Sequence, residues 1–271
     1  MRSSRLRAIV LAAALGAGIA PVAAATCGND SSGFKEWVES FKPDATAQGI
    51  SQRTVDAALS GVKYSNATIK LDRNQKVFKQ SFETFSGRMI PPRMKRAKNQ
   101  LAKHADTFAR IEQQYGVPKE IVVAIWGLET DFGAVSSNNS VLSAVATLAY
   151  DCRRSDFFRG QLIDALRIVE RGDLSPAQMT GGLHGEIGQT QFLPSSYVAF
   201  AVDFDGNGHA DLIRSTADVL ASTANYMRGK GWQKGADWMP GSSNFSVIKE
   251  WNKSDIYSRT VAEFARRLSE G

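Results

Sequence analysis

One glutamate stands in a setting that suits acid chemistry. Glu129 lies in the run 121–133, four residues after Ile125 and seven and eight after two further apolar residues, so on a helix it shares a face with apolar side chains. Burial disfavours the charged form of a carboxyl group and raises its pKa, which an acid needs in order to protonate a leaving group near neutral pH. The same spacing fits a buried structural acid paired with Arg153 or Arg154, so both interpretations stay open.

A second stretch has the pattern of a metal-binding loop. Residues 203–211 fit the first nine positions of a calcium-binding EF-hand loop, with glycine at the sixth position. The twelfth position, usually a glutamate, is Arg214, although Asp218 lies close enough to supply a carboxylate. A polar turn without metal is the alternative. The candidate ligands are Asp203, Asp205, Asn207, the backbone carbonyl of His209, and Asp211.

The N-terminal segment predicts export. Residues 1–25 carry three arginines, an apolar run from Ala8 to Ala20 and the small residues 23–25, which is the pattern of a cleaved signal peptide. The apolar run is shorter than the roughly 20 residues that span a bilayer, which argues against the alternative of a membrane anchor. We therefore expect an exported chain, residues 26–271, without a membrane span.

The cysteines predict one disulfide. Cys27 and Cys152 are the two cysteines of the chain, and an exported protein meets an oxidising compartment, where such pairs usually join. Lipid attachment to Cys27 is disfavoured, because Ala24 and Thr26 stand where a bacterial lipobox has other residues. We predict the disulfide Cys27–Cys152, with two buried free thiols as the alternative.

Composition indicates one globular unit and no nucleic-acid partner. The chain has 271 residues, of which 43% are hydrophobic and 22% charged. Its formal net charge of +6 includes the three arginines of residues 1–25, which hold no acid, so the rest of the chain carries +3. Basic stripes and nucleic-acid-binding motifs are missing from the sequence. We expect a monomer with a single domain, and its mild positive charge is compatible with an anionic cell-wall polymer.

Apolar spacing predicts a mainly helical fold. Strictly alternating stretches are scarce, and irregular or Gly-rich stretches cover 172–211 and 229–251. Pro118 and Glu120 mark the start of the helix that carries Glu129. The predicted helices are 33–48, 51–60, 72–86, 95–115, 118–131, 140–149, 155–171, 195–201, 215–229 and 258–269.

Several ordered blocks resemble one enzyme family. The segment from Tyr115 to Gly133 resembles the catalytic segment of the membrane-bound lytic transglycosylase B family. Further blocks follow in the family's order and cover almost all of residues 26–271: Arg153-Arg154, Gly188 to Tyr197, Asp203 to Leu212, Ala224-Asn225-Tyr226, and Trp251 to Ser254 with Tyr257.

The resemblance implies a fold, an activity and a location. It implies a mainly α, lysozyme-like catalytic domain with a small irregular or β lobe and an EF-hand-like loop, acting in the periplasm on peptidoglycan glycan strands. Glu129 would protonate the glycosidic oxygen between N-acetylmuramic acid and N-acetylglucosamine. It would then deprotonate the C6 hydroxyl of the muramoyl residue, which attacks its own anomeric carbon and forms a 1,6-anhydro end. One carboxylate suffices because no water has to be activated. Catalysis would need no cofactor, and calcium would be structural.

The resemblance also implies the residues that contact the glycan. Gln191 matches the family glutamine beside the catalytic acid, where an amide can both donate to and accept from the N-acetyl group. The aromatic residues are suited to stack on sugar faces, and the arginine pair to bind a lactyl carboxylate or a peptide stem. The implied positions are Gln191, Phe192, Arg153, Arg154, Asn225, Tyr226, Asn252 and Tyr257.

The chain departs from the family pattern at two places. Residues 182–186 read Gly-Leu-His-Gly-Glu where the family has Ser-x-Ala-Gly-Ala, so His184 or Glu186 would replace the serine that orients the catalytic acid. Trp251 stands where some relatives have tyrosine. Glu186 as a second carboxylate would permit a hydrolytic muramidase instead. A third reading is a calcium-stabilised peptidoglycan-binding protein without catalysis, which requires Glu129 to be locked in an ion pair.

Overall fold

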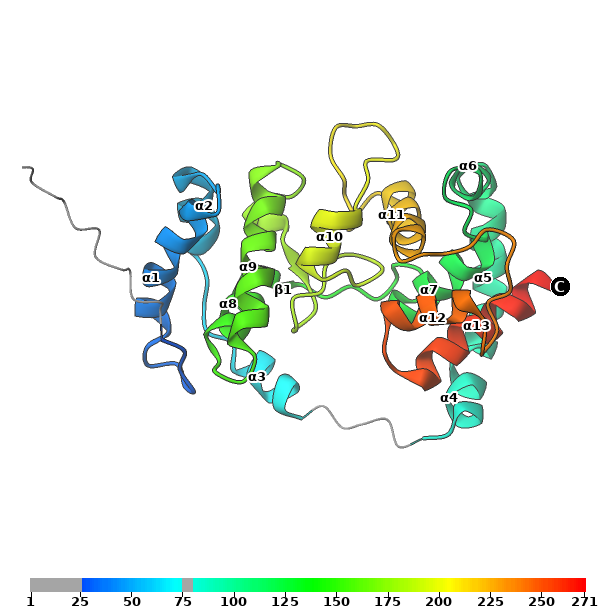
Figure 1. Ribbon diagram of the computed structural model, residues 1–271, viewed down its shortest axis with the longest axis horizontal. Coiled ribbons are helices and arrows are strands. Elements are labelled where there is room, and N and C mark those ends of the chain that lie inside the picture. The colour runs from blue at the N-terminus through cyan, green and yellow to red at the C-terminus, as the bar shows by residue number, and fades with distance from the viewer. Residues whose placement is uncertain (1–25, 75–79) are drawn as a thin grey trace, which may run out of the picture.

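The fold is mainly helical, as predicted. The structure, a computed structural model, describes residues 26–74 and 80–271, so the predicted signal peptide lies outside the described residues. Figure 1 shows two helix groups, with α10 (Pro194–Phe200) and a small sheet between them. Within the described ranges, no helix is both long and apolar enough to cross a membrane.

The first helix group lies beside the N-terminal end of the described chain. In it α8 packs along α9, and α1, α2 and α3 pack against this pair. Its members are α1 (Phe34–Ala47), α2 (Gln52–Leu59), α3 (Asn66–Arg73), α8 (Val141–Tyr150) and α9 (Ser155–Glu170).

The second helix group surrounds the helix that carries Glu129. In it α7 packs against α5, α6, α11 and α13. Its members are α4 (Phe82–Met89), α5 (Pro91–Lys103), α6 (Ala105–Tyr115), α7 (Lys119–Thr130), α11 (Thr216–Gly229), α12 (Ser243–Trp251) and α13 (Asp255–Ser269).

The β structure of the described chain is short. Strands β1 (Asn139–Ser140) and β2 (Thr180–Gly181) pair antiparallel, with Asn139 opposite Gly181. Beside them, Ile187 and Phe192 exchange both backbone hydrogen bonds, at 2.7 and 3.0 Å, and close a tight hairpin. This small lobe lies between the helix groups and carries the Gly-rich loop toward α7.

Three predicted helix assignments are corrected by the structure. The helix expected over 72–86 is wrong: α3 ends at Arg73 and α4 begins at Phe82, each capped at its start by a serine. The helix expected over 95–115 is two helices that meet at His104. The stretch 229–251, expected to be irregular, contains α12, whose start is fixed by Ser242 accepting a hydrogen bond from the Phe245 amide.

Helix α7 is buried over most of its length and ends abruptly after Glu129. Gly127 is required there, because a Cβ at this position would lie 2.7 Å from the Phe132 ring. Asp131, Phe132 and Gly133 then adopt left-handed conformations with φ of 54°, 61° and 76°. Such backbone is costly for residues other than glycine and occurs most at functional sites. It turns the chain sharply and leaves Glu129 in the last helical turn.

The predicted disulfide is confirmed. Cys27 and Cys152 are bonded, with Cα atoms 5.0 Å apart and a sequence separation of 125. Next to the bond, the Gly28 amide donates to the Tyr150 carbonyl at 2.9 Å. The disulfide therefore ties the start of the described chain to the end of α8, in the first helix group.

Candidate active site

Glu129 lines a cavity of about 440 Å³. This volume is in the usual range for a small-ligand site. The walls come from α7, from the start of α9, from the hairpin, and from the ends of α11 and α12. They are formed by Glu129, Arg154, Phe157, Phe158, His184, Glu186, Gln191, Phe192, Leu193, Ser196, Tyr226, Glu250, Trp251 and Asn252.

Two donors hold the carboxylate of Glu129. The Tyr257 hydroxyl donates to Oε1 at 2.6 Å, and the Trp251 indole nitrogen donates to the same oxygen at 3.0 Å. Burial raises the pKa of Glu129, the two hydrogen bonds lower it in part, and the charge of Glu186 raises it further. The balance is a raised pKa, which keeps the carboxyl group protonated to higher pH than an exposed glutamate.

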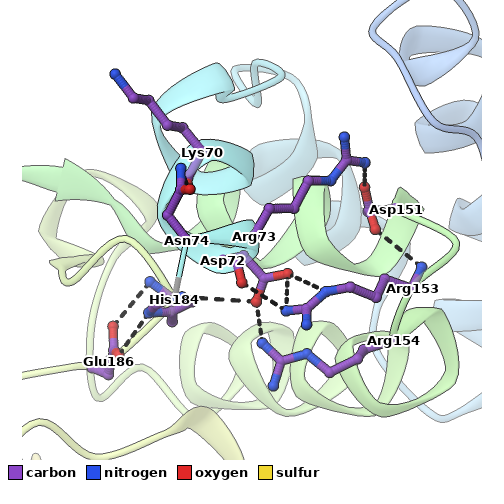
Figure 2. A network of polar contacts seen from close by, with 9 residues as sticks. All are labelled: Lys70, Asp72, Arg73, Asn74, Asp151, Arg153, Arg154, His184 and Glu186. Carbon is purple, nitrogen blue, oxygen red and sulfur yellow. Dashed lines mark hydrogen bonds and ion pairs between the residues drawn. The ribbon is translucent and has the colours of Figure 1, made fainter. Parts of the chain in front are cut away.

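The arginine pair considered as partners of Glu129 is bonded elsewhere. Arg153 donates from Nε to Asp72 at 2.7 Å, and Arg154 also forms an ion pair with Asp72 (Figure 2). Asp72 lies on α3 and is 2% exposed. Burial on its own would raise the pKa of Asp72, but the bonds from both arginines outweigh it and lower that pKa. An ion pair of Glu129 with this arginine pair is therefore not formed.

The hairpin brings Gln191 and Phe192 to the cavity. Gln191 has a φ of 57°, in the left-handed region, and its Nε2 donates to the Gly188 carbonyl at 2.7 Å. Phe192 is 2% exposed and meets the Tyr226 and Trp251 rings edge-on, with centroids 6.0 and 5.2 Å away. Phe192 thus belongs mainly to the packing behind the cavity wall and shows only a small part of its surface there.

The structure places the remaining predicted contact residues at different depths. Tyr226 and Asn252 line the cavity, and the Tyr226 hydroxyl donates to the Glu250 carbonyl at 2.7 Å. Asn225 is turned away, with its amide donating to the Phe200 carbonyl at 2.9 Å. Tyr257 is nearly buried behind Glu129 and contacts it directly. Arg154 is at the cavity wall, whereas Arg153 is outside it.

Two residues that shape this site, Gln189 and Trp251, were not assigned a role from the sequence. Gln189 accepts a hydrogen bond from the Trp126 indole at 2.9 Å, while its backbone carbonyl accepts one from Thr130 at 2.5 Å. These bonds fix the hairpin to the end of α7. Trp251 was noted only as standing where some relatives have tyrosine, but its indole nitrogen donates to Glu129 at 3.0 Å. This donor could have been inferred from the sequence, because an indole N–H group can only donate a hydrogen bond.

His184 and Glu186, named as replacements for the missing serine, both line the cavity. Glu186 accepts a hydrogen bond from the His184 amide at 3.0 Å, and the His184 ring nitrogen Nδ1 lies 3.5 Å from the other carboxylate oxygen. The structure therefore places two carboxyl groups, Glu129 and Glu186, on the walls of one cavity.

The metal-binding loop forms an acidic cluster. Carboxylate oxygens of Asp203, Asp205 and Asp218 lie within 4.8 Å of one another. Asp203 also accepts hydrogen bonds from backbone amides of the loop, at 2.7 to 3.0 Å. Asp211, predicted as a ligand, is paired with Arg214 at 2.6 Å and lies outside this group of three, whereas Asp218, considered as a substitute for the twelfth position, belongs to it. Oxygen donors of this kind suit calcium.

Comparison with known proteins gives consistent relatives. A family model described as the transglycosylase SLT domain matches residues 33–242. Membrane-bound lytic murein transglycosylase B of Escherichia coli (strain K12) is 40% identical over 134 residues, which are 49% of this chain and 37% of that protein. The chain thus aligns with well under half of the length of that curated relative.

Solved structures agree over a larger part of the chain. SltB3 from Pseudomonas aeruginosa in complex with NAG-anhNAM-pentapeptide has a TM-score of 0.82 and 31% identity, covering 88% of this chain and 80% of that one. An Escherichia coli lytic transglycosylase in complex with calcium has a TM-score of 0.75 and 24% identity, covering 91% and 96%. At this level of identity, the second comparison shows a shared fold alone.

Proposed function

The chain belongs to the transglycosylase SLT domain family, and we propose that it is an exported lytic transglycosylase. It cleaves the β-1,4 bond between N-acetylmuramic acid and N-acetylglucosamine in peptidoglycan and leaves 1,6-anhydromuramoyl ends. The observation that carries the proposal is the half-buried carboxyl group of Glu129 in a cavity wall, where burial raises its pKa. The predicted signal peptide supports a periplasmic location, and the relative SltB3 was solved with an anhydro-sugar peptide.

Glu129 serves first as acid and then as base. Its proton passes to the glycosidic oxygen as the bond from that oxygen to the anomeric carbon breaks. The C6 hydroxyl of the same muramoyl residue then attacks the anomeric carbon, and the Glu129 carboxylate takes the hydroxyl proton. The acid is thereby restored and no water is consumed. The donors Tyr257 and Trp251 stabilise the carboxylate that exists between the two steps.

The cavity walls suit a glycan strand. Gln191 and Asn252 offer amides that can bond the N-acetyl groups, and Tyr226 offers a ring face. Arg154 offers a positive charge to a lactyl carboxylate or peptide stem. Arg153 and Asn225 lie outside the cavity wall, so in this proposal they do not contact the glycan but hold neighbouring residues in place.

A digestion separates the proposed activity from its alternatives. Purified peptidoglycan is incubated with the enzyme and the released muropeptides are weighed. We expect anhydro ends, which are one water lighter than reducing ends. Reducing ends would instead support a hydrolytic muramidase, for which Glu186 offers a second carboxylate on the cavity wall. Absence of any cleavage would support the non-catalytic binding protein.

We also propose that the loop at 203–211 binds one structural calcium ion. Asp203, Asp205 and Asp218 would hold it with their carboxylates, joined by the Asn207 side chain and the His209 carbonyl. The carboxylates then no longer repel one another, so the bound ion stabilises the connection between α10 and α11.

Calcium is therefore expected to raise the melting temperature. Saturating ion at about a hundred times Kd contributes about 2.7 kcal/mol, and each kcal/mol corresponds to about 2–4 °C for a domain of this size. Thermal melts with calcium and with chelator measure the difference. The Asp203→Asn/Asp205→Asn variant should melt at one temperature in both conditions, and magnesium should shift the wild type less. Equal melting of the wild type with and without calcium would contradict the site.

A further inference from the structure

Glu186 is fixed in one place by its surroundings. Its carboxylate accepts a hydrogen bond from the backbone amide of His184 at 3.0 Å, and the side chain is 27% exposed. A Cβ at Gly182 would lie 2.2 Å from the Glu186 oxygen Oε2. No side chain at 182 can therefore coexist with this position of the carboxylate. The glycine leaves the space that the Glu186 carboxylate fills.

A chain of polar groups continues from Glu186 into the first helix group. The His184 ring has Nδ1 at 3.5 Å from Glu186 and Nε2 at 3.8 Å from Asp72 (Figure 2). Asp72 is itself held by Arg153 and Arg154. A histidine placed between two carboxylates has little rotational freedom, since each ring nitrogen faces one of them. The position of Glu186 is thus set from α3, far from it in sequence.

We propose that Glu186 is a second catalytic carboxylate, which stays ionised in the cavity and stabilises the positive charge that develops at the anomeric carbon, with His184 as its positioning residue. The inference rests on the proposed function and deepens it. In glycoside cleavage the transition state resembles an oxocarbenium ion, so a fixed negative charge beside it lowers the barrier. Glu186 transfers no proton in this role, and Glu129 keeps both proton steps.

The environments of the two carboxyl groups support different roles. Burial raises the pKa of Glu129. Burial would also raise the pKa of Glu186, but hydrogen bonds from the side chain and backbone of His184 outweigh it and lower that pKa. Between these two pKa values Glu129 is neutral and Glu186 is charged, which is the arrangement of an acid beside an electrostatic stabiliser. The charged or titratable groups that share the cavity wall with Glu186 are Glu129, Arg154, His184, Tyr226 and Glu250, and Asp72 lies behind His184.

The first test replaces the charge and keeps the shape. Glu186→Gln is expected to lower kcat on the order of 10²-fold with little change in KM, because the lost charge acts on the transition state. For the wild type we expect kcat/KM to fall at low pH as Glu186 is protonated, and we expect this acidic limb to disappear in the variant. His184→Ala should move the limb to higher pH, since the bonds that lower the pKa of Glu186 are lost. Glu36→Gln, an exposed position on α1, is the matched control.

The second test displaces the carboxylate without changing it. Gly182→Ala puts a methyl group where Oε2 lies, so its kcat should fall as in Glu186→Gln, and the double variant should be no slower than Glu186→Gln alone. Gly160→Ala, in α9 with nothing within 4 Å of the added carbon, is the matched control. Melting temperatures confirm that each variant is folded.

Failure of the role of Glu186 and failure of the proposed function give different results in these experiments. Anhydro products from the wild type together with unchanged kcat and an unchanged acidic limb in Glu186→Gln would overturn the role of Glu186 and leave the proposed function standing. Wild-type reducing ends that vanish in Glu186→Gln would assign Glu186 to activation of water, and would also overturn it. A wild type without cleavage products would overturn the proposed function itself.

Discussion

Glu129→Gln is expected to lower kcat for glycan cleavage by about 10²–10⁴-fold, the usual contribution of a positioned acid or base. An amide has nearly the same shape and can still accept hydrogen bonds from Tyr257 and Trp251, but it has no acidic proton to donate. The fold and glycan binding should therefore persist. The rate of release of soluble muropeptides from purified peptidoglycan measures the loss, and sedimentation with insoluble peptidoglycan measures binding.

Glu120→Gln is the matched control for this variant. Glu120 lies in the first turn of the same helix, outside the cavity, so its replacement should leave kcat near the wild-type value. A Glu129→Gln enzyme that cleaved at more than about a tenth of the wild-type rate would remove Glu129 from the acid role, because general acid catalysis contributes more than this.

Tyr257→Phe is expected to move the alkaline limb of kcat/KM to higher pH. The Tyr257 hydroxyl bonds the ionised form of Glu129 and so lowers the pKa of that carboxyl group; its removal raises this pKa. Since cleavage begins with protonated Glu129, activity persists to higher pH. A hydrogen bond to a charged group contributes about 1.5–3 kcal/mol, which corresponds to about one to two pH units.

The same variant should also lower kcat on the order of tenfold to a hundredfold, because the carboxylate formed in the transition state loses a donor. Trp251→Phe should act in the same direction and less strongly, since its bond to Glu129 is longer. Tyr115→Phe, on α6 and away from the cavity, is the control. An alkaline limb that stayed in place in Tyr257→Phe would show that this bond does not control the protonation of Glu129.

Helix α7 was predictable from local signals, whereas other boundaries were not. Pro118, Glu120 and a continuous apolar run marked α7 within one residue of its observed ends. The predicted helix 72–86 failed because amphipathic spacing continued past Arg73 while the serine cap before Phe82 was not weighed. Helix α12 was missed because the region around it is rich in glycine and aromatic residues, and a single cap at Ser242 was the main local signal.

The sequence could predict single residues of the site, but not the contacts between distant segments that position them. Glu129 could be identified from its apolar helix face and its family block. Its partner Trp251 was known only as a departure from the family pattern, and its geometry depends on where α12 ends. The pairing of Asp72 with Arg153 and Arg154 joins α3 to the start of α9, about 80 residues apart, and no local periodicity records such a contact.

The Gly-rich loop shows why departures from a pattern are informative. In the sequence, residues 182–186 departed from the family pattern, and nothing linked Gly182 to Glu186. In the structure the two positions depend on each other, because the Glu186 carboxylate occupies the space beside Gly182. Steric exclusion between two positions can be tested only once their distance is known.

Digestion of peptidoglycan in water labelled with heavy oxygen tests the central claim most directly. If Glu129 directs attack by the substrate's own C6 hydroxyl, the new muramoyl ends are anhydro ends and carry no label from the solvent. Mass spectrometry of the released muropeptides measures both the type of end and its heavy-oxygen label in one experiment. Reducing ends that carry one heavy oxygen from water would contradict the claim and identify the enzyme as a hydrolase.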